Sequence, residues 1–69
     1  MKRKAVLDKL KAAAKAQGKT FATRELTRHT GVTVGGASRT LGRHAEVDDA
    51  TARKFWGQFD CELGRGWWR

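Results

Sequence analysis

The side chains that could bind a metal ion or act as a nucleophile are few in this chain and widely spaced. Cys61, His29 and His44 are the only soft metal ligands, and they lack the paired close spacing of a zinc module. No nucleophile motif, phosphate-binding loop or paired-acid arrangement accompanies them. The sequence therefore predicts no catalytic residue, no enzyme activity, no metal site and no cofactor, and we interpret Cys61 as a small buried apolar residue.

Positive charge is the strongest chemical feature of the chain. Its 15 Lys and Arg against 7 Asp and Glu give a formal net charge of +8 in 69 residues, which is enough to attract polyanions. Residues 1–44 hold eleven Lys or Arg against two acids, a balance of +9, and residues 45–69 hold four against five, a balance of −1. This distribution favours a nucleic acid as the partner. A chain this short has little room for an enclosed active site, so we expect no small-molecule substrate.

The composition also bears on where the protein acts. No segment approaches the eighteen or so apolar residues of a membrane span, so no membrane association is expected. The basic start MKRK is followed by charged residues rather than by the apolar stretch of a signal peptide. A single cysteine cannot form an internal disulfide, which favours a reducing compartment. We expect a cytoplasmic protein associated with the nucleoid.

The first segment has the spacing of an amphipathic helix. Between Arg3 and Gln17, apolar residues recur at helical intervals while most lysines fall elsewhere on the helical wheel. Gly18 is a natural residue to follow the end of such a helix. The short link after it contains Phe21 as its one large apolar residue, and we expect this link to be extended.

The middle of the chain has the spacing of two short helices joined by a tight turn. Thr23 can cap a helix that runs to about Thr30, and Gly31 permits the left-handed backbone that such a turn usually requires. Thr33 can cap a third helix covering about residues 34–44. Two helices joined by so few residues cross steeply, so the second would project from the body of the protein.

The last third of the chain mixes helix and strand patterns. Asp48 and Asp49 could cap a short fourth helix from Ala50 to about Gly57. Apolar and acidic residues then alternate from Phe59 to Leu63, as in a half-buried strand, and a Gly-Arg-Gly tip follows. This order predicts a terminal β-hairpin. The six Phe and Trp rings are expected to supply most of the core.

The segment GVTVGGASRTL, residues 31–41, resembles the turn and recognition helix of bacterial and phage helix-turn-helix repressors. With the wider order of elements, the chain is similar to a winged helix domain. The resemblance implies a mostly α fold in which one domain, residues 1–69, has a three-helix helix-turn-helix core, a C-terminal β-hairpin and a possible short fourth helix.

The resemblance also implies a set of DNA contacts. Arg39 is the best candidate for base reading, because a guanidinium donates a fork of hydrogen bonds to guanine. The residues expected to face bases in the major groove are Val34, Gly35, Ser38 and Arg39. Those expected to bind phosphates are Thr23, Arg24, Thr33, Gly36, Arg43, Lys4 and Lys19. Arg65, at the hairpin tip, would enter the minor groove. The chain departs from the family by placing Val34 and Gly35 where polar, base-reading residues are usual.

The leading hypothesis is a DNA-binding repressor that regulates transcription by sequence-specific or semi-specific binding of double-stranded DNA. One recognition helix covers few base pairs, so a homodimer is expected. Two alternatives belong to other classes. The chain could be a protein-interaction module, such as a small phage-encoded inhibitor or an assembly component, that uses its aromatic end and the acidic stretch 46–49. It could also be a general RNA or single-strand binder, in which aromatic rings stack on bases.

Overall fold

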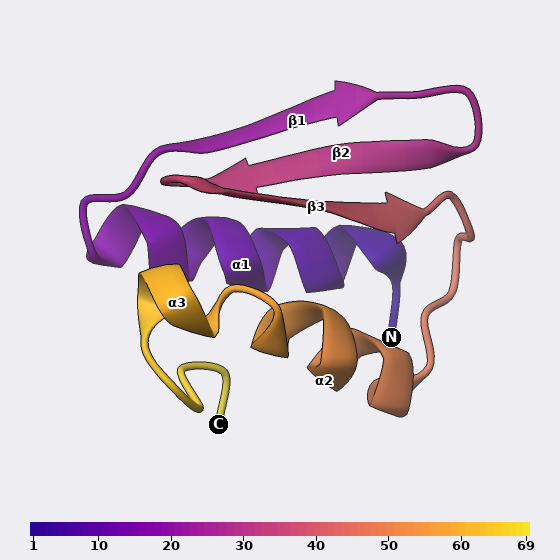
Figure 1. The fold of residues 1–69 in the computed structure, drawn as a ribbon. Helices are drawn as coiled ribbons and strands as arrows, with labels where there is room; N and C mark the ends of the chain where they lie inside the picture. Colours follow the sequence, from indigo (N-terminus) through magenta and orange to yellow (C-terminus); the bar gives the residue numbers. More distant parts are fainter.

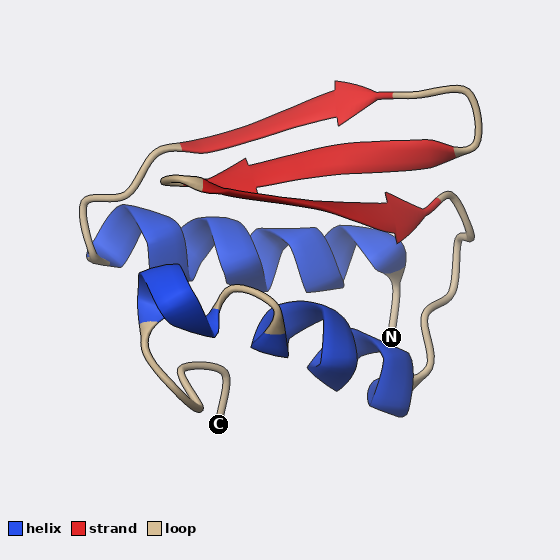
Figure 2. Ribbon diagram, viewed as in Figure 1, coloured by secondary structure: helices blue, strands red, loops and turns tan.

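The fold combines one layer of helices with one antiparallel sheet. The computed structural model describes all of residues 1–69. The elements in chain order are α1 (Arg3–Ala16), β1 (Phe21–Glu25), β2 (His29–Val34), β3 (Ala37–Gly42), α2 (Asp49–Gly57) and α3 (Asp60–Leu63). The sheet has the order β1-β2-β3 (Figure 1). All three helices lie on one side of it, which leaves its other side without a covering element (Figure 2).

Helix α1 follows the predicted amphipathic pattern. Val6, Leu10 and Ala14, spaced by four, are its fully buried residues and form the stripe that packs on the core. Gln17 caps the C-terminal end, and Gly18 has a φ of +69°, as expected for a residue that stops a helix. The predicted first helix and its end are thus confirmed. None of the helices combines the length and the apolar character needed to cross a membrane.

The predicted three-helix core with a helix-turn-helix is wrong. The two segments expected to be its second and third helices lie instead in the sheet, as β1, β2 and β3. Thr30, Val32 and Val34 alternate on β2 and are all buried, which is the period of a half-buried strand. Gly35 and Gly36 form a two-residue turn to β3, and Gly35 has a φ of +56°. A Gly-Gly pair between two such runs favours a hairpin over a helix.

Helix α2 confirms the predicted fourth helix and its cap. The side chain of Asp48 accepts a hydrogen bond from the backbone N–H of Thr51 at 3.2 Å. The hydroxyl of Thr51 bonds to the same carboxylate, and these two bonds hold the pKa of Asp48 below its ordinary value.

The predicted terminal hairpin is also wrong, so the chain has no wing. Asp60–Leu63 is a short helix, and residues 64–69 form turns without a strand. Phe59 and Leu63, four residues apart, are both buried, a spacing that suits a helix as well as it suits alternation along a strand. Cys61 is exposed rather than buried.

The core lies between the inner face of the sheet and the helices. Ten of its thirteen buried residues are Val, Leu or Ala and three are aromatic, so the prediction that aromatic rings supply most of the core is wrong. The rings of Phe55 and Phe59 meet edge to face at a centroid distance of 5.3 Å. Trp67 and Trp68 pack against the buried Trp56, and the Nε1–H of Trp67 donates to the carbonyl of Trp56 at 2.9 Å. These contacts fix the C-terminal turns on the helical side of the molecule.

Candidate nucleic-acid interface

The side of the sheet that faces away from the helices is covered by no other element and is open to solvent (Figure 2). Thr30, Val32 and Val34 on β2 point inward, so the residues that alternate with them on β2 point outward. The residues of β1 and β3 that pair with these outward residues point outward as well. We call this surface the outer sheet face; its residues are Ala22, Arg24, His29, Gly31, Thr33, Ser38, Thr40 and Gly42. Three of these residues carry hydroxyl groups and one is an arginine, and the two glycines have no side chain.

A shallow hollow of about 510 Å³ lies on the outer sheet face. Gly31 forms its floor, since this position has no side chain to fill the space between β1 and β3. Leu26, 41% exposed, lies beside it, with Cδ1 3.8 Å from the point where a Cβ on Gly31 would stand. On the β3 side the hydroxyls of Thr33 and Ser38 hydrogen-bond to each other at 2.9 Å. The hollow therefore combines hydroxyl groups with a mostly apolar surface, to which Leu26 contributes.

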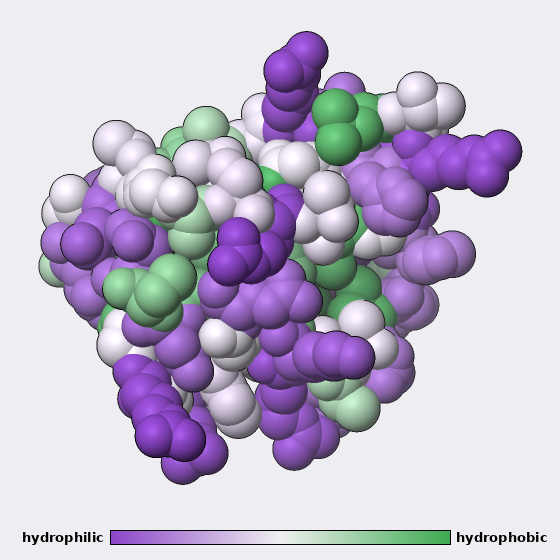
Figure 3. Space-filling view, viewed as in Figure 1, coloured by the Kyte–Doolittle hydropathy of each residue, from purple (hydrophilic) through white to green (hydrophobic).

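Charge in the sheet and its connecting turns is mostly positive, although of the two strand arginines only Arg24 lies on the outer sheet face by register, because Arg39 pairs with the inward-facing Val32. Residues 20–44 contain four arginines, namely Arg24, Arg28, Arg39 and Arg43, but a single carboxylate, Glu25. Glu25 pairs in register with Thr30, whose side chain faces the helices, so this carboxylate does not lie on the outer sheet face. Figure 3 shows long hydrophilic side chains projecting around a small hydrophobic group at the end where β1 turns into β2. Such a surface attracts anions without an acidic group to repel them.

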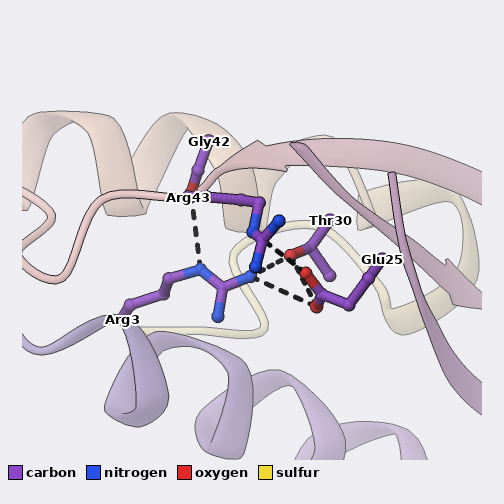
Figure 4. Close-up of polar contacts among 5 residues, drawn as sticks. All are labelled: Arg3, Glu25, Thr30, Gly42 and Arg43. Carbon is purple, nitrogen blue, oxygen red and sulfur yellow. Dashed lines mark hydrogen bonds and ion pairs between the residues drawn. The ribbon is translucent and has the colours of Figure 1, made fainter. Parts of the chain in front are cut away.

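A cluster of polar side chains ties the strands to α1 at this end of the sheet (Figure 4). Arg43 Nε lies 3.1 Å from Glu25 Oε2, and Arg3 Nη2 lies 3.7 Å from Glu25 Oε1. The Arg3 guanidinium also donates to the hydroxyl of Thr30 and, at 3.4 Å, to the carbonyl of Gly42. Two guanidinium groups therefore share one carboxylate, and the cluster keeps a net positive charge.

Both histidines lie beside Gly42 at the same end of the sheet, although 15 positions separate them in the sequence. His29 begins β2 and pairs in register with Gly42 on β3. The ring of His44 lies beside Gly42, with Cδ2 3.3 Å from the point where a Cβ on that glycine would stand. Directly paired residues have Cβ positions about 5 Å apart, so both histidines lie close to Gly42. We call this group, with Arg28 and Arg43, the sheet corner.

Several residues predicted to contact DNA come together on or beside the outer sheet face. Arg24, Thr33 and Ser38 belong to it, and Thr23 and Arg39 help to line the hollow. Arg39 is exposed at the edge of the sheet, where its Nη1 donates to the carbonyl of Ser38 at 2.6 Å. These five residues lie on three strands rather than on one helix.

Other predicted contacts are placed elsewhere. Val34 is fully buried in the core and cannot reach a base. Gly35 and Gly36 form the β2–β3 turn, and the N–H of Gly36 donates to Glu62 Oε1 at 3.2 Å. Arg43 is held in the ion pair with Glu25. None of these positions serves a recognition helix.

The remaining three predicted contacts lie on α1 or in loops. Lys4 pairs with Asp8 one turn along α1 at 3.0 Å, and Lys19 Nζ lies 3.9 Å from Glu62 Oε1. Arg65 is exposed between Gly64 and Gly66 in the C-terminal turns, so its predicted place at the tip of a wing is wrong.

Sequence reasoning missed the sheet corner. Nothing in the spacing of His29 and His44 indicates that both lie beside Gly42, because the register of the β2–β3 hairpin places them there. No group of three or more His, Cys, Asp or Glu side chains is arranged to hold a metal ion. Comparisons of the chain with models of protein families, with curated proteins and with solved structures find no match.

Proposed function

We propose that this protein binds helical RNA through the outer sheet face. The observation that carries the proposal is an open hollow bordered by Arg24 and Arg39 and by hydroxyl side chains, with no carboxylate among its lining residues. Arg24 and Arg28 can contact phosphates, and the hydroxyls of Thr33, Ser38 and Thr40 can exchange hydrogen bonds with ribose 2′-OH groups and base edges. These are the contacts by which proteins recognise an RNA helix through its shape.

The width of the sheet favours RNA over DNA. Neighbouring strands lie about 4.8 Å apart, so the two outer strands are about 10 Å apart before their side chains are counted. The major groove of B-DNA is about 12 Å wide and admits an α-helix or a two-stranded ribbon. Once its side chains are counted, a three-stranded sheet is wider than this groove. The minor groove of A-form RNA is wide and shallow. A three-stranded face with short side chains suits the RNA groove better.

Single-stranded nucleic acid is disfavoured because the outer sheet face has no stacking platform. Proteins that hold single strands stack bases on exposed aromatic rings. Here Trp56, Phe55 and Phe59 are buried, Trp67 and Trp68 pack on the core, and Phe21 points inward beside α1. None of the six aromatic side chains lies on the outer sheet face.

Double-stranded DNA is the second candidate, with a changed mode of contact. Residues 34–44 cannot enter the major groove as a helix, because they form a turn and a strand. Strands β2 and β3 alone make a two-stranded ribbon that carries Thr33, Ser38 and Arg39, and ribbons of this kind can read a DNA groove. A role in transcription regulation would depend on this second mode.

Fluorescence anisotropy with labelled duplexes tests both candidates. We expect an RNA duplex to bind more tightly than a DNA duplex or a single strand of the same sequence, with affinity falling steeply between 50 and 200 mM salt. Arg24→Ala should weaken RNA binding and reduce the slope of log affinity against log salt by about 1. Arg53→Ala is the matched control, because Arg53 is an exposed arginine on α2.

Three outcomes would contradict the proposal. Tighter binding of DNA would select the second candidate, and tighter binding of the single strand would exclude both. Equal losses in the Arg24 and Arg53 variants would show that net charge, rather than the outer sheet face, attracts the RNA.

A further inference from the structure

The sheet corner has a chemical character that the rest of the outer sheet face lacks. His29 and His44 are exposed, and both lie beside Gly42. Neither imidazole has a hydrogen bond or ion pair within the chain, so their ring nitrogens are free to meet a ligand. Gly42 has no side chain, and the ring of His44 lies against the place where one would begin.

The charged groups around the corner leave its donors available. Arg28 precedes His29 in the β1–β2 turn and has no ion-pair partner, and Arg43 follows β3 directly. The nearest carboxylates are already engaged. Glu25 on β1 is shared by Arg43 and by Arg3 of α1. Glu46 pairs with the ammonium of Lys2 and lies 3.8 Å from the amino terminus, and Asp48 accepts hydrogen bonds from Thr51.

We propose that His29 and His44, with Arg28 and Arg43, form a phosphate-binding site whose occupant is a backbone phosphate of the RNA bound along the outer sheet face. The inference rests on the proposed function and adds to it that the affinity for RNA depends on pH. A protonated imidazole presents two N–H donors and a positive charge to an oxyanion, whereas a neutral one presents a single donor. The site therefore holds phosphate more tightly when the histidines are protonated.

The expected consequence is RNA binding that strengthens as the pH falls. Histidine is the side chain that ordinarily changes charge between pH 5 and pH 8. Two additional exposed charge contacts with phosphate correspond to a gain in affinity of about tenfold. The salt dependence should become steeper at the lower pH, because each added phosphate contact releases further counterions.

The test is an RNA titration at pH 8 and at pH 5.5 with the full chain. Wild type should bind about tenfold more tightly at pH 5.5. The double variant His29→Gln with His44→Gln should lose most of the gain in affinity between pH 8 and pH 5.5, because glutamine retains hydrogen bonding but no charge. Arg24→Ala should lose affinity equally at both pH values and keep the gain. Circular dichroism of each variant at both pH values checks that the fold is retained.

The NMR signals of the imidazole protons show whether the site binds a phosphate of the RNA backbone or a free phosphate ion. Adding the RNA duplex should shift the signals of both histidines, and inorganic phosphate should displace the RNA only at far higher concentration. If RNA binds but the pH gain survives in the double variant, the phosphate site is overturned while the proposed function stands. If wild type binds no RNA at either pH, the proposed function fails. Shifts with inorganic phosphate alone would then assign the site to free phosphate.

Discussion

Glu62 on α3 accepts a hydrogen bond from the backbone N–H of Gly36 at 3.2 Å, and this bond joins the last helix to the β2–β3 turn across 26 residues. The carboxylate also lies directly over the place where a side chain on Gly35 would begin. The turn is therefore held both by its own backbone geometry and by a side chain from the far end of the chain.

Gly35→Ala should destabilise the protein by about 2 kcal/mol. Its φ of +56° is strained for alanine, and the new methyl group would displace Glu62 from Gly36. Thermal unfolding should show a midpoint about 8–16 °C lower. Gly57→Ala is the control, because it lies in α2 with no atom within 4 Å of the added methyl group. That variant should be neutral or more stable, and equal losses in both would contradict this role of Gly35.

Val34 and Ser38 should have opposite effects when each is replaced by alanine. Val34 is fully buried, so Val34→Ala should lower the free energy of unfolding by about 2 kcal/mol and leave the RNA affinity of the folded protein unchanged. Ser38 is exposed on the outer sheet face, so Ser38→Ala should weaken RNA binding by about 1 kcal/mol with little change in stability. Denaturant melts and RNA titrations measure the two effects. The reverse result would contradict the placement of Val34 in the core and of Ser38 on the RNA-binding surface.

Glu25→Gln should strengthen RNA binding a few-fold. The substitution frees the guanidinium groups of Arg3 and Arg43 from their shared carboxylate and adds one unit of positive charge beside the sheet corner. The substitution should lower the free energy of unfolding by less than about 1 kcal/mol, because more than half of the Glu25 side chain is exposed. Asp8→Asn, which releases Lys4 on α1 and makes the same change in net charge, is the control. An equal gain from Asp8→Asn would assign the effect to overall charge alone.

Asp48 should make the stability of the fold depend on pH in the acid range. Its pKa is lowered in the folded state by the hydrogen bonds from Thr51, so its contribution is present above the unfolded pKa of about 4 and is lost as the pH falls through the lower folded value. Asp48→Ala should therefore lower the melting temperature at pH 7 and converge with wild type at about pH 2. Asp48→Asn keeps a capping side chain without the titration. A difference between wild type and Asp48→Ala that is the same at both pH values would contradict this assignment.

The two longer helices could be predicted from the sequence, and the sheet was missed for an identifiable reason. In a helix, Val34, Ala37 and Leu41 share one face because they are three and four residues apart. In a hairpin turning at Gly35-Gly36, Val34 and Ala37 are opposite each other and Leu41 lies on the same side of β3. A helix and a hairpin would bury the same three residues, so the spacing of the apolar residues could not distinguish the two structures. The Gly-Gly pair was the local signal for the hairpin.

The candidate site was predictable in its residue types and not in its geometry. Arg24, Thr33 and Ser38 were expected to contact a nucleic acid because arginine and hydroxyl side chains suit phosphate and base edges. Their placement on one surface depends on the register of three strands, which no local pattern specified. The placement of His29 and His44 beside Gly42 depends on the same register.

The exposed thiol of Cys61 gives the molecule a defined orientation for experiments. It is the single cysteine of the chain and lies on α3, in the helical layer on the side of the sheet opposite the outer sheet face. A maleimide linker at this position would anchor the protein to a sensor surface by its helical side. The strands would then point into solution, so that immobilisation leaves them free to meet a ligand.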